Sequence, residues 1–435
     1  MTAFRLDSAH LSILLPMISS NNDLQPMSTP LWSPLVLFAL ALTALPGFAA
    51  SLGETVTAAL TQGGQQQRVA ALRGERDAVR NQAGSLIAAD PALRLKGLSD
   101  RMTENDGAYE LEAMVDMPMW LPGQRSARIA VAESLGMRAD ALQRLLRWEA
   151  AGQVREAAWE AALAHGQLRQ AAAALQAAKS LEATVAKRTD AGELARMELL
   201  TARQETAARR VDMSAAQLGY DQAIAAFVLL TGQPRLPDPL TEPVPDALAI
   251  GDTGVTLPPD HPLLATAGGA LAQARAERER ANAERRGHPL LSLGGKRARD
   301  DRTVNPVDAV QLEISIPFGL KRQAAPMLAS AEREVTDRLT DLHRIRREAE
   351  RALKAAALAR RGADDALLLA RERARLATDA LTITRRAFNL GEADLAALLR
   401  AEERARNASL ALELRSLEQG RAVAQLNQAL GVVPE

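Results

Sequence analysis

The sequence contains an internal repeat with a constant spacing. A turn motif, Gly-Glu followed by a Leu-Leu pair, occurs between Gly192 and Ala202 and again 199 residues later, between Gly391 and Ala401. The same spacing relates six further pairs of identical residues: Pro118 and Pro317, Gln124 and Gln323, Glu133 and Glu332, Arg147 and Arg346, Glu149 and Glu348, and Gly232 and Gly431. A constant period over this length predicts two copies of one architecture, from about residue 107 to 232 and from about 306 to 431.

Each turn motif lies between two long helical patterns. The run from Ser126 to Arg188 is rich in Ala and contains no Pro, and Gly192 can end it in a left-handed C-cap conformation. In the second copy the helix is expected to run from Pro326, at its first turn, to Asn389. At 1.5 Å per residue the first of these helices would be on the order of 95 Å long. The sequence therefore predicts two long helical hairpins with tight tips.

Alternating patterns with a period of two precede each long helix. Leu93 and Leu95 begin the first pattern, and the residues from 109 to 117 continue it after an Asp-Gly turn signal at Asp106. In the second copy the apolar positions of the pattern are Leu291, Leu293, Val310, Leu312, Ile314 and Ile316. Each copy thus predicts one β-hairpin with strands of roughly 9 to 11 residues, a length that crosses a bilayer when tilted.

Composition excludes several classes of protein. The formal net charge is +0, which argues against a nucleic-acid partner. The chain has no Cys, and a predicted helix separates His261 from His288, so we expect no metal site. We find no phosphate loop, nucleophile triad or paired-acid cleft, so we expect neither a cofactor nor an enzyme.

The N-terminal region has a secretory pattern. An apolar run at residues 35–42 precedes small residues at Ala49 and Ala50, and it is too short to span a membrane as a helix. We expect cleavage after Ala50. The predicted organisation is then a signal peptide and upstream segment, a first repeat, a Pro-rich equatorial connection and a second repeat, at residues 1–50, 51–232, 233–260 and 261–435. The connection either wraps the helices as a belt with short helices or forms a disordered linker.

Four strands in one chain cannot close a barrel, and open sheet edges do not persist in lipid. Subunits are therefore expected to share one barrel, with eight strands from two chains or twelve from three. Strand alternation places six polar residues on the water-filled side, and we expect a largely acidic interior that favours cations. These barrel-lumen residues are Glu110, Glu112, Asp116, Gln311, Glu313 and Ser315.

The duplicated plan of helix, β-hairpin, long helix, Gly-turn and helix resembles the TolC family of outer-membrane efflux proteins. The segment from Trp120 to Arg125 is similar to the metal-exporting branch of that family. The resemblance implies a mostly α fold with a small β part, in which long helical hairpins form an α-barrel continuous with a shared membrane β-barrel. It also implies a homotrimer in the cell outer membrane with a long periplasmic part.

In function, the resemblance implies the channel of a tripartite efflux or secretion system, with a periplasmic adaptor protein, an inner-membrane pump and outer-membrane lipid as partners. The alternative is a soluble periplasmic coiled-coil or adaptor protein, which would explain the helices but not the four alternating segments.

The resemblance further implies that the tips dock the adaptor and that an acid near a tip narrows the pore. Glu198 matches such an acid, whereas Ala397 and Arg400 occupy the corresponding places in the second copy. The tip Leu residues either contact the adaptor or pack between neighbouring hairpins. The candidate docking residues are Gly192, Glu193, Leu199, Leu200, Gly391, Glu392, Leu398 and Leu399.

Overall fold

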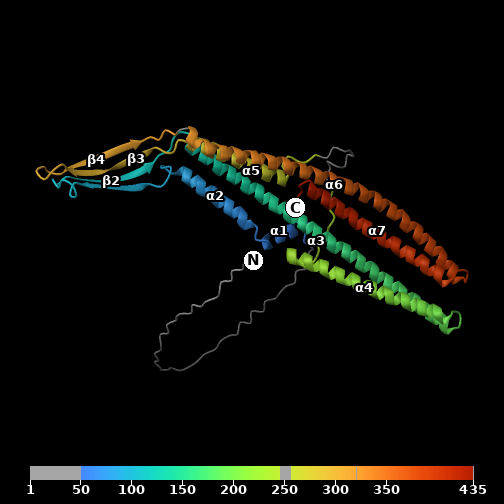
Figure 1. The fold of residues 1–435 in the computed structure, drawn as a ribbon. Helices are drawn as coiled ribbons and strands as arrows, with labels where there is room; N and C mark the ends of the chain where they lie inside the picture. Colours follow the sequence, from blue (N-terminus) through green and yellow to red (C-terminus); the bar gives the residue numbers. More distant parts are fainter. Residues whose placement is uncertain (1–49, 245–255, 320, 435) are drawn as a thin grey trace, which may run out of the picture. The chain divides into compact units, whose positions relative to one another are not determined.

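The computed structural model describes residues 50–244, 256–319 and 321–434 (Figure 1). The signal-peptide prediction concerns a segment that lies, apart from Ala50, outside these residues, and it stays a prediction. Seven helices and four strands are described, in the order α1 (Leu52–Gln62), α2 (Gln66–Gly84), β1 (Ala92–Ser99), β2 (Tyr109–Pro118), α3 (Gln124–Asp190), α4 (Arg196–Thr231), α5 (Pro262–Glu284), β3 (Leu290–Arg299), β4 (Val307–Ser315), α6 (Lys321–Asn389) and α7 (Leu395–Ala429).

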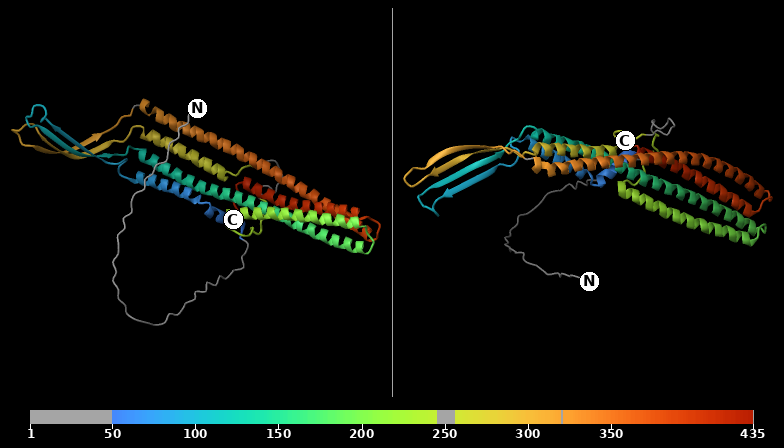
Figure 2. Two further views of the ribbon diagram at one scale, coloured as in Figure 1. Left: turned by 60° about the horizontal axis from the view of Figure 1, so that its bottom comes forward. Right: turned by 45° about the horizontal axis from the view of Figure 1, so that its top comes forward.

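The helices form a single layer. Near the sheet, α2, α3, α5 and α6 lie side by side in that order (Figure 2). Towards the tips, α4 and α7 take the places of α2 and α5, so that the contacts there run from α4 to α3, from α3 to α7 and from α7 to α6. The strands lie at one end of this layer, and the turns of the two helical hairpins, between α3 and α4 and between α6 and α7, lie at the other end. The predicted fold class, mostly α with a small β part and two structural repeats, is confirmed.

Two helices run through the full length of the layer. α3 has 67 residues and α6 has 69, which correspond to about 100 Å each at 1.5 Å per residue. α6 begins at Lys321, before the predicted start, so Pro326 lies inside the helix rather than in its first turn. Within the described residues, we find no helix whose length and apolar character would let it cross a membrane.

The helical pattern after Ser51 is interrupted. The sequence pattern predicts one helix from Ser51 to about residue 89, but a Gly63–Gly64 pair separates α1 from α2, and Gly64 has a positive φ of 61°. Ser51 caps α1 in a capping box with Glu54. After α2 the chain leaves the helix, and Ile87 forms an isolated antiparallel bridge to Met119. The adjacent Gly residues cost helix stability, which explains the break.

The four strands form one antiparallel sheet in the order β1-β2-β3-β4. The two predicted hairpins are therefore confirmed, and they are joined through pairing of β2 with β3. In that register Glu112 pairs with Lys296 and Asp116 with Ser292. Each described edge strand, β1 or β4, pairs on one side only.

Small apolar clusters along the helices replace a central core. One cluster joins α1, α3 and α4 around Phe227, a second joins the tips around Phe388, and a third joins α6 and α7 around Leu353. Small residues let the helices approach closely: a Cβ added at Gly420 of α7 would lie 2.3 Å from the Trp159 ring of α3. The high Ala content thus serves side-by-side packing of helices.

A buried polar network ties the Pro-rich connection to the helices. Arg155 of α3 makes a bidentate pair with Glu242, with nitrogen–oxygen distances of 2.8 and 2.6 Å, and the two side chains are only 4% and 9% exposed. The Arg155 Nη1 group also donates to Gln428 of α7 and to the carbonyl of Val432. Residues 233–244 contain no helix, so the predicted short helices are absent from this described part of the connection.

Candidate functional site

The six predicted barrel-lumen residues lie on one face of the sheet. Paired residues of an antiparallel sheet point to the same side, and the register connects Asp116 through Ser292 to Glu313. Glu110 and Glu112 precede Asp116 by six and four residues in β2, both even intervals, and Gln311 and Ser315 lie two residues on either side of Glu313 in β4. We call this side the polar face.

Three basic side chains that we did not assign from the sequence lie on the same face. Arg94 binds Asp116 through two hydrogen bonds of 3.0 and 2.7 Å. Lys96 and Lys296 lie 2.9 and 2.7 Å from the carboxylate of Glu110. The polar face therefore carries four carboxylates, including Glu313, and three cations. The expectation of a largely acidic face is wrong, because the neighbouring strands supply nearly enough positive charge to balance it.

The opposite face of the sheet is apolar and exposed. Along each strand it presents large aliphatic side chains to solvent: Leu93, Leu95, Leu111, Val115, Leu293, Val310, Leu312 and Ile314. No helix of the described residues packs on the sheet. At the level of Leu111 the same face also carries the exposed ion pair of Arg297 with Asp308. The aliphatic part of the face indicates contact with lipid or with another apolar partner.

A buried glutamine fixes the junction between sheet and helices. Gln124, the first residue of α3, donates to the carbonyls of Gly287 and Ala283 and accepts from the Leu121 N–H group. His288 Nδ1 lies 2.9 Å from the Gln124 amide oxygen. Burial lowers the pKa of His288 and the charge of Arg128 adds to this, while Glu284 opposes it. The neutral ring therefore fits the junction.

The two tips have the same backbone geometry. Gly192 and Gly391 have φ values of 77° and 79°, in the left-handed region that favours Gly. At each tip the N–H of the following Glu donates to a carbonyl five residues back, at Arg188 and Ala387, with a length of 2.9 Å. These are Schellman turns. The repeated Gly-Glu motif therefore encodes the same reversal twice.

The tip Leu residues divide between packing and exposure. Leu398 is buried with Val185, Ala202, Phe388 and Leu395 in a cluster that joins the two hairpins of one chain. Leu199 and Leu399 are partly buried against the same cluster, whereas Leu200 is exposed. Packing between the two hairpins of one chain therefore accounts for three of the four tip Leu residues.

The charged tip residues stay near the surface. Glu193 accepts a hydrogen bond from Arg188 at 3.0 Å, and the Arg188 guanidinium lies 4.9 Å from the centre of the Phe388 ring of the other hairpin. Glu392 is exposed, and Glu198 is half-buried in the first turn of α4. The structure thus brings the predicted docking residues together at one end of the helices.

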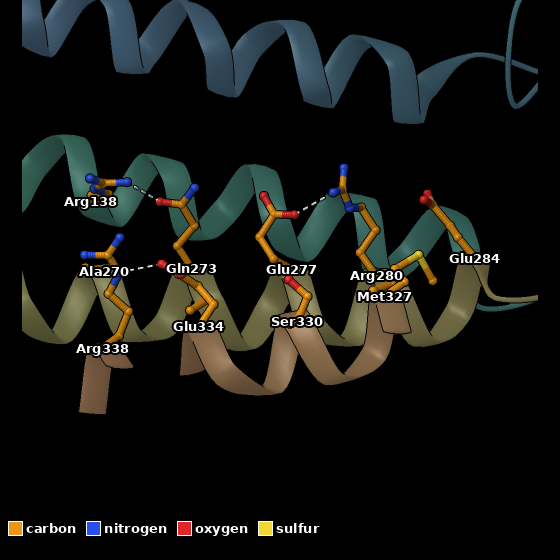
Figure 3. Close-up of a pocket in the computed structure, with 13 residues that line it drawn as sticks. Arg138, Ala270, Gln273, Glu277, Arg280, Glu284, Met327, Ser330, Glu334 and Arg338 are labelled. Carbon is orange, nitrogen blue, oxygen red and sulfur yellow. Dashed lines mark hydrogen bonds and ion pairs between the residues drawn. The ribbon is translucent and has the colours of Figure 1, made fainter. Parts of the chain in front are cut away.

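A groove of about 520 Å³ lies between α3, α5 and α6 (Figure 3). Its polar side chains pair with one another: Arg138 donates to Gln273, Arg280 binds Glu277 and Arg338 binds Glu334. The described lining residues include no His. In the part of the chain that the structure describes, no three His, Asp or Glu residues cluster as a metal site would require. The groove offers no reactive arrangement.

The fold and the two-faced sheet together define a class of structure: paired long helical hairpins with four strands at one end. Solved outer-membrane channels share this fold. CusC, whose structures concern folding and transmembrane channel formation, matches with a TM-score of 0.67 and 18% identity over 89% of this chain and 94% of its own. VceC of Vibrio cholerae matches with a TM-score of 0.65 and 17% identity over 88% and 96%.

A third match is the open state of the MtrE channel of Neisseria gonorrhoeae, with a TM-score of 0.64 and 18% identity over 88% of this chain and 89% of that one. No protein-family model and no curated protein matches the sequence. The TolC-type fold expected from the repeat is therefore confirmed by structure rather than by sequence similarity.

Proposed function

We propose that the protein is the outer-membrane channel of a tripartite efflux or secretion system, giving cargo an exit duct across the periplasm and the outer membrane. The observation that carries this proposal is the sheet, which has one charged face, one exposed aliphatic face and two open edges. Such a sheet needs water on one side, lipid on the other and strand partners at both edges. The alternative, a soluble periplasmic adaptor, would not require a sheet with a charged face, an exposed aliphatic face and two open edges.

Closure of the barrel requires further copies of the chain. Three copies would contribute twelve strands, enough to enclose a lumen, whereas two would contribute eight, whose interior side chains fill. The proposed trimer places β1 of one subunit beside β4 of the next. The strands have 8 to 10 residues, close to the roughly 9 to 11 needed to cross a bilayer at a tilt.

The helices offer a matching seam between subunits. α4 and α6 lie at opposite sides of the layer near the tips, and each presents exposed apolar residues at intervals of seven or fourteen, which follow the repeat of a coiled coil. Aligned antiparallel from the tips, the two rows fall in register: Met197 with Leu390, Val211 with Leu376 and Leu218 with Leu369. We infer that α4 of one subunit packs on α6 of the next and closes the helical barrel.

The tips then point away from the membrane towards a periplasmic adaptor and an inner-membrane pump. The exposed residues left for docking are the two Gly-Glu turns and Leu200, because Leu199, Leu398 and Leu399 pack inside the tips. Glu198 of three subunits would surround the pore at this end. We propose a cell outer-membrane location with a long periplasmic part, and removal of residues 1–50 on export.

The proposal is tested by a pair of adjacent substitutions in β4. Leu312→Asp places a charge on the aliphatic face, where it should cost somewhat less than the about 2–4 kcal/mol of an Arg or Lys at the bilayer centre, and it should strongly reduce recovery from outer membranes. Gln311→Asp places the same charge on the polar face and should assemble normally. Light scattering in detergent should give three chains for the wild type, and planar bilayers should show conductance.

Two results would contradict the proposal. One is a wild-type protein that is monodisperse and fully extracted without detergent. The other is equal recovery of Leu312→Asp and Gln311→Asp from membranes, because the aliphatic face would then not meet lipid.

A further inference from the structure

We propose that Lys96 and Lys296 set the ion selectivity of the channel by neutralising Glu110 and Glu112 on the polar face of the sheet. The inference rests on the proposed function and identifies which residues decide the charge of the permeating species. It predicts a barrel lumen with little preference between cations and anions, in place of the cation preference that the carboxylates of the sheet alone would give.

The geometry encloses each carboxylate between two ammonium groups. Glu110 of β2 lies between Lys96 of β1 and Lys296 of β3, at 2.9 and 2.7 Å. Glu112 lies 3.6 Å from Lys96 and 3.7 Å from Lys296. Four charges from three adjacent strands thus form one group, which we call the lysine-glutamate cluster, and its formal charge is zero.

Exposure determines which of these charges a passing ion meets. The Lys96 and Lys296 side chains are 52% and 33% exposed, whereas those of Glu110 and Glu112 are 23% and 11% exposed. The carboxylates therefore lie beneath the ammonium groups. An ion in the water beside this face approaches the lysines first, so they screen the negative charge as well as balance it.

A second group lies closer to the helices on the same face. Arg94 pairs with Asp116 and lies 3.7 Å from Glu313, which leaves one negative charge uncompensated. The two groups together carry a formal charge of −1 per chain. Rings of charged side chains govern ion selectivity in channels. A ring with a formal charge of −1 per chain should therefore discriminate only weakly between cations and anions.

The lysines can be replaced without loss of the fold. The Lys96 and Lys296 side chains are themselves 52% and 33% exposed, and Met preserves most of their aliphatic stems. The double variant Lys96→Met, Lys296→Met adds six uncompensated carboxylates, Glu110 and Glu112 of each chain, to the three that a three-chain barrel of the wild type already has. Charged clefts concentrate counter-ions about tenfold or more, so the ratio of cation to anion permeability should rise by up to about tenfold.

The measurement is the reversal potential of single channels in planar bilayers under a potassium chloride gradient. The double lysine variant should reverse closer to the potassium equilibrium potential than the wild type does, because Glu198 at the tips is the same in both proteins. Glu110→Gln with Glu112→Gln should shift the opposite way, and the variant with all four substitutions should return close to the wild type. Light scattering in detergent confirms that each variant retains the wild-type assembly.

Arg297→Met is the matched control. Arg297 follows Lys296 in β3, points to the opposite face and is paired with Asp308 at 3.5 Å. Arg297→Met removes one positive charge per chain, half of the change in the double lysine variant, from the same level of the sheet, and it should leave the reversal potential unchanged.

Three results would overturn the inference. Channels of the lysine variant with wild-type selectivity would show that the cluster does not decide selectivity, while the proposed function would stand. A shift in Arg297→Met without one in the lysine variant would show that the faces are reversed. Absence of any wild-type conductance would remove the proposed function and the inference together.

Discussion

The two repeats place equivalent residues in different surroundings. Gln124 at the start of α3 is fully buried and makes four hydrogen-bond contacts, whereas Gln323, its equivalent in α6, is exposed. Arg155 in the middle of α3 is buried in a polar network, whereas its equivalent Lys354 is exposed. The backbone is duplicated, but the side-chain environments are not.

The difference follows from position in the layer. α3 has neighbours along both sides, α2 and α5 near the sheet and α4 and α7 near the tips. α6 lies at one side of the layer, beside α5 and α7. One chain therefore resembles a segment of a closed helical barrel. The long helix of the first repeat, α3, lies inside this segment, and the long helix of the second repeat, α6, lies at its edge. In the proposed trimer the edge helix gains its second neighbour from the next subunit.

The largest expected effect is at Arg155. Arg155→Met leaves Glu242 buried without its partner, and breaking a buried pair in this way costs about 3–5 kcal/mol. The free energy of unfolding, or the melting temperature in detergent, should fall strongly. Lys354→Met is the matched control and should change stability by less than about 0.5 kcal/mol, as for other exposed sites. Similar losses of stability at both positions would contradict the conclusion that the two equivalent residues have different environments.

A smaller effect of the same kind is expected at Gln124. Gln124→Ala leaves the carbonyls of Gly287 and Ala283 without their donor in a buried site, a loss of about 1–3 kcal/mol. Gln323→Ala should be nearly neutral in the isolated subunit. Thermal unfolding of the two variants side by side measures the difference, and equal melting temperatures would argue that the junction is not held by this side chain.

Much of the fold was predictable because it is encoded locally. The period of two marked all four strands, and the Gly-Glu motif marked both reversals, since only a residue tolerant of positive φ fits there. The break at Gly63 and Gly64 was missed because a weak helical pattern continues across it. Its signal, two adjacent Gly residues, was present in the sequence.

The charge balance of the polar face was harder to predict from the sequence. Arg94 and Lys96 alternate with Leu93 and Leu95, but their side of the sheet depends on the register between β1 and β2. Lys296 follows two Gly residues that interrupt the alternation in β3. The Arg155 network joins residues 87 and 273 positions apart, and no local pattern indicates such contacts.

In the proposed trimer, identical chains close into a ring through contacts between α4 and α6. The sequence contains no Cys, so a pair of introduced cysteines reports on one contact alone. Val211→Cys combined with Leu376→Cys should form disulfides between subunits and give a covalent three-chain species on non-reducing gels. Val211→Cys combined with Ile383→Cys is one heptad out of register and should cross-link poorly. A monomer in the first case, or equal cross-linking in both, would show that α4 and α6 do not form the contact between subunits in this register.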